Sequence, residues 1–226
     1  MERRRRFQRG TVALAAVVVA ACSMPASAAF VYGFSGIRGM DPPPDQVLAV
    51  ADQFRMTVES AGGGSQAWFT IRNAGPRDVA ITSIYFDGDV LDDIEGIDDD
   101  RMSGVAFDET APGLPNLPDG DALDPDFDAD LAVHALPPAA AMTNAIDAGQ
   151  ALGVLFDLDN GFDSVIAAIG AGDLRVGLYT LVRDSECDNA NASFVNQPTV
   201  IPAPGAILLA ALGTGLIGML RRRRML

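Results

Sequence analysis

The fold class follows from one alternating stretch in the second half of the chain, Leu174-Arg175-Val176-Gly177-Leu178-Tyr179. Its large apolar residues recur at every second position, the period at which β-strand side chains point to the same face. We therefore expect a strand over residues 174–182, with one face in the core and the other partly in solvent. Similar runs elsewhere would make the domain all-β.

Runs of the same kind do recur upstream. They are rich in β-branched and aromatic residues and are separated by Gly, Pro and Asp. These runs are Phe54–Val58, Ala67–Arg72, Val79–Phe86 and Leu152–Leu158. Helical periodicity is brief, at Ala139–Ala145 and Ser164–Gly170. The pattern predicts an antiparallel β-sandwich of about eight or nine strands.

Two glycine-containing segments are predicted to be tight turns. Asn73-Ala74-Gly75-Pro76 combines a residue that tolerates positive φ with one whose φ is fixed, so we expect it to join two strands as a hairpin. Gly62-Gly63-Gly64 is predicted to be a flexible hairpin loop.

A long acidic loop, Gly88–Pro138, is expected to interrupt the strands. From Asp87 to Asp130 there are 16 carboxylates and a single basic residue, Arg101. Such a loop either stays solvated or gathers a cation, and calcium is the natural candidate because it prefers hard oxygen ligands. Neither candidate cluster matches an EF-hand loop, so both interpretations stand. The clusters are Asp87-Gly88-Asp89 with Asp92-Asp93, and the alternating Asp124, Asp126 and Asp128 that continue to Asp130.

Charge separates the ends of the chain from its middle. All 16 basic residues are Arg, and nine of them lie in the first nine and the last six residues. Phe30–Pro204 keeps seven Arg against 29 Asp and Glu. A domain with this excess of negative charge repels nucleic acid and anionic lipid, so no nucleic-acid partner is expected.

Residues 1–29 have the three parts of a secretory signal peptide. Five Arg precede an apolar run, Thr11–Ala21, which is too short to span a membrane. Small residues follow, and signal peptidase requires small side chains one and three residues before its cut. It can use Ser27 and Ala29 and cut after Ala29, which leaves Phe30 as the first mature residue. Alternatively, it can use Ala26 and Ala28 and cut one residue earlier. An alternative is a lipoprotein signal, because Val19-Ala20-Ala21-Cys22 is similar to a lipobox in which the Cys is acylated.

Residues 201–226 have the parts of a membrane-inserted tail. Ile201–Leu220 carries no charge, and Gly205–Leu220 is predicted to be a transmembrane helix of 16 residues. That helix would be about 24 Å long, slightly short for a bilayer. Arg221, Arg222, Arg223 and Arg224 would stop transfer and stay in the cytoplasm, which leaves residues 30–200 on the periplasmic side.

The order of these elements resembles a known family of sorting tails. Pro202, Ala203 and Pro204, then a Gly/Ala/Leu-rich span and an Arg cluster, resemble the PEP-CTERM and VPxxP-CTERM tails of exosortase substrates. The commonest motif of that family has Glu where this chain has Ala203. The resemblance implies processing by an exosortase in the inner membrane of a Gram-negative bacterium, followed by delivery to the cell surface or the medium. It also implies an association with extracellular polysaccharide.

The residues give no support to an enzyme. His134 is the single His, and no Gly-x-Ser-x-Gly elbow or nucleotide-binding glycine pattern occurs. We expect His134 to be a surface or partly packed residue and Trp68 to be a core residue rather than a sugar-stacking platform.

The sequence therefore predicts an exported surface or matrix protein with a structural or adhesive role and no cofactor unless calcium binds. The alternative is a secreted carbohydrate- or calcium-binding module that keeps its membrane anchor.

Overall fold

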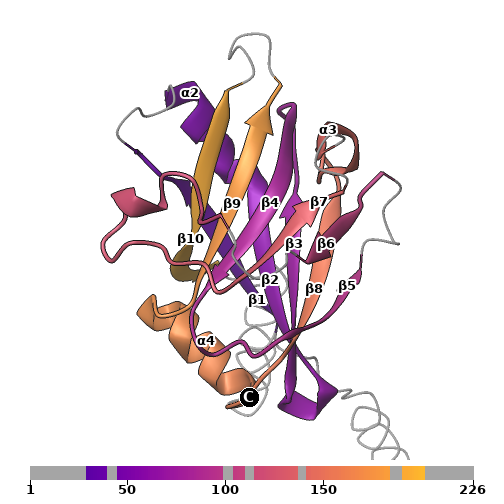
Figure 1. Ribbon diagram of the computed structural model, residues 1–226, viewed down its shortest axis with the longest axis vertical. Coiled ribbons are helices and arrows are strands. Elements are labelled where there is room, and N and C mark those ends of the chain that lie inside the picture. The colour runs from indigo at the N-terminus through magenta and orange to yellow at the C-terminus, as the bar shows by residue number, and fades with distance from the viewer. Residues whose placement is uncertain are drawn as a thin grey trace, which may run out of the picture.

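The computed structural model describes residues 29–39, 45–98, 104–109, 115–136, 141–183 and 190–201. These residues form ten β-strands, short helices and connecting loops (Figure 1). The strands are β1 Phe30–Gly36, β2 Phe54–Ala61, β3 Gln66–Asn73, β4 Val79–Asp87, β5 Ile94–Asp98, β6 Phe107–Glu109, β7 Leu131–Ala135, β8 Ala151–Asp157, β9 Arg175–Val182 and β10 Asn191–Ile201. The helices are α2 Asp45–Leu48, α3 Ala141–Asn144 and α4 Phe162–Ala171, with single 3₁₀ turns at η2 Ala49–Gln53, η3 Gly62–Gly64 and η4 Gly120–Ala122.

All ten described strands belong to one antiparallel sheet in the order β5-β8-β3-β2-β1-β10-β9-β4-β7-β6. The prediction of an all-β antiparallel domain is confirmed. The structure differs from a sandwich of two sheets, because hydrogen bonding continues without a break from one edge to the other. Strand β10 makes this connection, since it pairs with β1 on one side and with β9 on the other.

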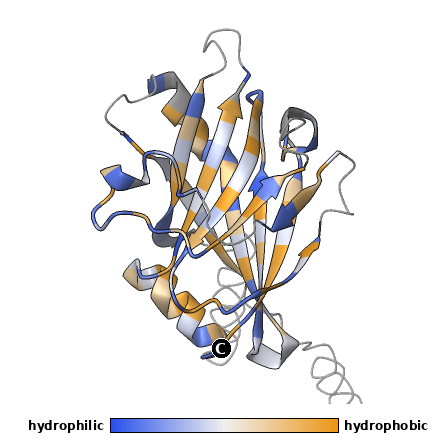
Figure 2. Ribbon diagram, viewed as in Figure 1, coloured by the Kyte–Doolittle hydropathy of each residue, from blue (hydrophilic) through white to orange (hydrophobic). Residues whose placement is uncertain are grey.

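The sheet folds over so that one face encloses the main core. Phe69 on β3 packs edge-on against Phe86 on β4 at 5.8 Å between ring centroids, although four strands lie between β3 and β4 in the sheet. Phe156 on β8 completes the ring cluster at 4.7 Å from Phe86. Figure 2 shows hydrophobic and hydrophilic residues alternating along the strands, as expected when one face is buried.

Helix α4 lies at one end of this core, at the bottom of Figure 1. Val165, Ala168 and Ile169 occupy positions i, i+3 and i+4 of the helix, and all three are buried in the core. The helix ends at Gly172, whose φ of 85° is the left-handed conformation that closes many helices. The predicted helical stretch 164–170 is therefore confirmed.

Five strands were predicted close to their observed positions, and one predicted hairpin is wrong. Gly62-Gly63-Gly64 does join the paired strands β2 and β3. Asn73-Ala74-Gly75-Pro76 does not form a hairpin, because β3 pairs with β2 and β8 whereas β4 pairs with β7 and β9. The chain crosses here from one half of the sheet to the other, and the buried Asn73 side chain holds the crossing in place.

Asn73 satisfies the backbone at this crossing. It is fully buried, its amide nitrogen donates to the carbonyls of Val79 at 2.6 Å and Ile146 at 3.3 Å, and its amide oxygen accepts from Gln53 Nε2 at 2.8 Å. The backbone N–H of Gly75 donates to the same oxygen at 3.2 Å. At this crossing the Asn73 side chain thus satisfies backbone groups that a hairpin would have paired with each other.

The prediction of one long loop over 88–138 is also wrong. This segment contributes three strands, β5, β6 and β7, and its residues 115–130 pack onto the sheet.

The predicted processing segments lie almost wholly outside the described residues. These are residues 1–28 of the signal peptide, with Cys22 and Ser27, and residues 202–226 of the tail, with the predicted span Gly205–Leu220. None of the helices in the described residues is long and apolar enough to cross a membrane.

Candidate functional site

The outer face of the sheet is divided into a covered half and an open half. The covered half lies over β10, β9, β4 and β7, and residues 115–130, which we call the acidic strap, pack against it. Leu117 and Phe127 of the strap form a second buried cluster with Tyr85, Ala132 and Ile37. The strap approaches the sheet closely at Gly177, where an added Cβ would lie 2.6 Å from Leu117 Cδ2. The acidic segment is therefore packed rather than freely solvated.

Arg175 fastens the strap to the sheet. Its guanidinium pairs with the carboxylate of Asp87, and both side chains are only 16% exposed. The same guanidinium donates to the carbonyl oxygens of Pro125 at 2.6 Å and Asp126 at 2.5 Å, and it lies 5.2 Å from the centroid of the Phe127 ring. A single buried cation thus satisfies one carboxylate and two strap carbonyls, with a cation–π contact in addition.

The calcium ligands predicted from the sequence do not come together in the described residues. Asp124, Asp126 and Asp128 are exposed on the strap. No group of three or more Asp, Glu, His or Cys side chains in the described part of the chain is close enough to hold a metal ion. The backbone carbonyls of Pro125 and Asp126, which lie within this stretch of the sequence, already accept hydrogen bonds from Arg175. Calcium binding therefore stays a prediction without geometric support.

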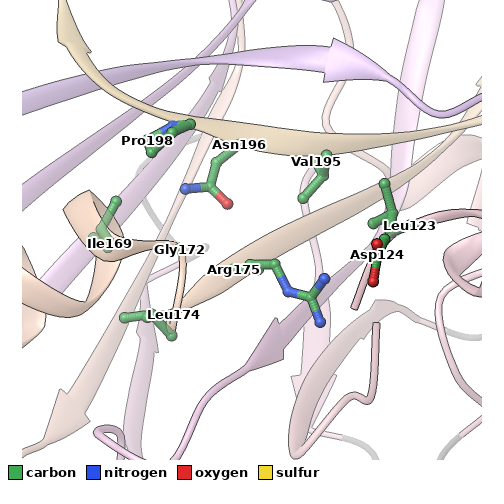
Figure 3. Close-up of a pocket in the computed structure, with 9 residues that line it drawn as sticks. All are labelled: Leu123, Asp124, Ile169, Gly172, Leu174, Arg175, Val195, Asn196 and Pro198. Atoms are coloured by element: carbon green, nitrogen blue, oxygen red, sulfur yellow. The ribbon is translucent and has the colours of Figure 1, made fainter. Parts of the chain in front are cut away.

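A small hollow lies beside Arg175, between the strap, helix α4 and strand β10. Figure 3 shows Arg175 and Asp124 at one side of it and Asn196 and Pro198 along β10. Its volume is about 180 Å³, below the usual range of ligand pockets. The Asn196 amide oxygen accepts from the backbone N–H of Val176 at 2.7 Å, so this amide has a structural task.

A larger pocket lies on the open half, over β2, β3, β8 and β5. Its volume is about 360 Å³, and its side chains include Trp68, Glu59, Asp98 and Thr70. The prediction that Trp68 is a core residue is wrong. Ala67, Phe69 and Ile71 point into the core, so the alternation of β3 places Trp68 on the outer face, where it is partly exposed.

Gly153 forms the floor of this pocket, which we call the Trp68 pocket. A Cβ atom on Gly153 would be 3.2 Å from Cζ3 of Trp68 and 3.5 Å from Cβ of Asp98. The missing side chain lets the indole ring of Trp68 and the side chain of Asp98 lie on either side of the same point of β8. The strand register brings two further polar side chains beside them, because Thr70 lies opposite Gly153 and Glu59 lies opposite Trp68.

This pocket is not apparent from the sequence alone. Glu59 and Asp98 are 39 residues apart and come together only because β2 and β5 flank β3 and β8. The outward position of Trp68 was predictable, because Ala67, Phe69 and Ile71 alternate along the strand and so place Trp68 on the opposite face.

His134 is partly buried, as predicted, and lies near the covered half. Its Nδ1 is 2.7 Å from the Ser83 hydroxyl, and its ring packs edge-on against Tyr85 at 5.3 Å. The other ring nitrogen, Nε2, is buried without a hydrogen-bond partner in the described residues. Burial lowers the pKa of His134 below its ordinary value. Asp108 lies opposite on β6 but is exposed.

This environment predicts a pH dependence of stability. As the pH falls, the unfolded chain binds a proton on His134 before the folded protein does, so the free energy of unfolding should decrease below about pH 6.5. The decrease should stop once the pH has passed the lower pKa of the folded state. His134→Gln takes up no proton and should lack this contribution. Urea unfolding of both proteins at about pH 7.5 and about pH 5 measures the difference, and equal losses of stability in the two proteins would contradict it.

The chain was compared with protein-family models, with curated proteins and with solved structures, and none of the three comparisons gave a match. An inference about function can therefore draw only on the residues and contacts of this chain.

Proposed function

We propose that the chain is an exported surface or extracellular-matrix protein of a Gram-negative bacterium, released by an exosortase and serving an adhesive or structural role. The observation that carries the proposal is the pairing of the first and last described strands. Val31 lies opposite Ile201 in the antiparallel pair β1–β10. The predicted signal-peptidase junction, Ser27 and Ala29 before Phe30, and the predicted sorting motif, Pro202-Ala203-Pro204, therefore adjoin neighbouring strand ends.

This arrangement suits a domain that is held at the inner membrane by both ends during export and then cut at both. Strand β1 begins at Phe30, the first residue expected after signal-peptide removal, and β10 ends at Ile201, directly before the Pro motif. Neither cut would remove a residue of the sheet. The folded domain would be left intact on the periplasmic side, with the predicted span Gly205–Leu220 remaining behind in the membrane and Arg221–Arg224 on its cytoplasmic side.

The division of the outer face favours the adhesive form of the proposal. The strap seals the covered half, whereas the open half presents a pocket with an aromatic side chain and two carboxylates. The volume of this pocket, about 360 Å³, is within the range of ligand sites, which supports a binding role.

Intact mass of the protein recovered from the medium and from membranes tests the processing. We expect a species that begins at Phe30 and ends close to Pro204, and its loss in a host that lacks the exosortase. Pro202→Ala with Pro204→Ala should prevent the C-terminal cut, whereas Thr199→Ala, an exposed change in β10, should leave it unaffected. A surface species that still ends at Leu226 would refute the sorting proposal and favour the permanently anchored binding module.

A further inference from the structure

The Trp68 pocket offers hydrogen-bond donors and acceptors around one aromatic side chain. Glu59 and Asp98 supply carboxylate oxygens, and Thr70 supplies a hydroxyl that can donate or accept. The indole N–H of Trp68 makes no hydrogen bond within the described residues and is not among the buried polar atoms there. A ligand with an apolar face and many hydroxyl groups uses all of these groups together, which is the chemistry of a pyranose ring.

The negative charge around the Trp68 pocket favours a neutral ligand over an anionic one. The whole chain has a formal charge of −14, and two of the side chains that line the pocket are carboxylates. Glu59 lies directly opposite Trp68, so its carboxylate would repel an anionic sugar stacked on that ring. A small cation would use the carboxylates, the hydroxyl and the ring, but it would leave the indole N–H without an acceptor. A neutral sugar satisfies both donors and acceptors.

The polar strip around the pocket is longer than one sugar ring. On β3 the outward residues run from Arg72 through Thr70 and Trp68 to Gln66, a rise of about 20 Å at the spacing of a strand. Arg55 lies opposite Arg72 at one end, and Gln66 donates to Asp157 at 2.9 Å at the other. Polar side chains thus continue on both sides of Trp68, which suits a chain of sugars better than a single one.

We propose that the open half binds a neutral polysaccharide chain, with one pyranose ring stacked on Trp68 and its hydroxyl groups held by Glu59 and Asp98. This proposal rests on the adhesive form of the proposed function and supplies the chemical class of its ligand. Aromatic anchors in such sites carry much of the affinity because they bury a large rigid surface at low entropic cost.

Isothermal titration of the full chain in detergent tests the proposal. The probes are the neutral hexasaccharides cellohexaose, mannohexaose and β-1,4-galactohexaose, the anionic hexagalacturonate, and tetramethylammonium chloride as a cation. We expect at least one neutral hexasaccharide to bind and neither charged probe to do so. Trp68→Ala should raise its Kd about tenfold or more, and Trp68→Phe should raise it less. Thr199→Ala, an exposed change on β10 that lies outside the pocket, should change the Kd less than about twofold.

A second variant keeps the test informative if Trp68→Ala folds poorly. Glu59→Gln preserves the shape of a partly exposed side chain and should weaken binding several-fold by replacing a charged acceptor. Failure of the wild-type chain to bind any neutral hexasaccharide, tighter binding of hexagalacturonate, or competition by tetramethylammonium would each overturn the proposal. Because binding is measured on the uncut chain, a failed sorting proposal would leave this result unaffected.

Discussion

Arg175→Met is expected to lower the free energy of unfolding by about 4 kcal/mol, because it leaves the largely buried Asp87 carboxylate without its cation. Met has an unbranched apolar side chain, but it cannot donate to the Pro125 and Asp126 carbonyls and it loses the cation–π contact with Phe127. The acidic strap should then detach from the covered half. Urea unfolding measures the stability, and hydrogen exchange of residues 115–130 reports the detachment.

Two further variants isolate the cause. Arg38→Met removes an exposed ion pair with Asp45, in which both side chains are more than half exposed, and should cost less than about 1 kcal/mol. Adding Asp87→Asn to Arg175→Met removes the unpaired charge and should recover part of the lost stability. Strap exchange that is as slow in Arg175→Met as in the wild type would show that the apolar contacts alone hold the strap.

Asn73→Leu is expected to lower the free energy of unfolding by about 3 kcal/mol. Leucine has a similar size but cannot bond to Val79, Ile146, Gln53 or Gly75, so several buried polar groups lose their partner at once. For a domain of this length the loss corresponds to a decrease in Tm of about 10 °C. Differential scanning calorimetry measures the change.

Its matched control is the neighbouring residue. Arg72 lies next to Asn73 on the same strand and is exposed, so Arg72→Ala should change stability by less than about 0.5 kcal/mol. Equal effects of the two substitutions would mean that the amide network at the β3–β4 crossing adds nothing beyond the strand itself.

The strands that the sequence predicts are those whose burial follows a simple period. β9 is an example, since Leu174, Val176 and Leu178 are fully buried while Arg175 and Tyr179 face outward. The period of apolar residues does not show which strands pair with each other. Asn73-Ala74-Gly75-Pro76 has the composition of a hairpin turn, yet its Asn side chain bonds to residues that are distant in sequence, such as Ile146.

The packed strap could not be predicted because its apolar residues are isolated among carboxylates. Leu117 and Phe127 are ten residues apart and show no strand or helix period. Their burial also requires that Gly177 has no side chain, and Gly177 lies 50 residues after Phe127 in the sequence. The Trp68 pocket has the same origin, since Gly153 makes room for a side chain from β3.

The central position of β10 determines when the domain can assemble. Without residues 191–201 the sheet consists of two separate pieces, β5-β8-β3-β2-β1 and β9-β4-β7-β6, each with an unpaired edge and an uncovered apolar face. The last of the described strands is thus the one that joins the pieces, so closure of the core is disfavoured until residues 191–201 have been made. The folded sheet therefore depends on pairing between segments that are far apart in sequence, because β10 lies beside β1, the first described strand.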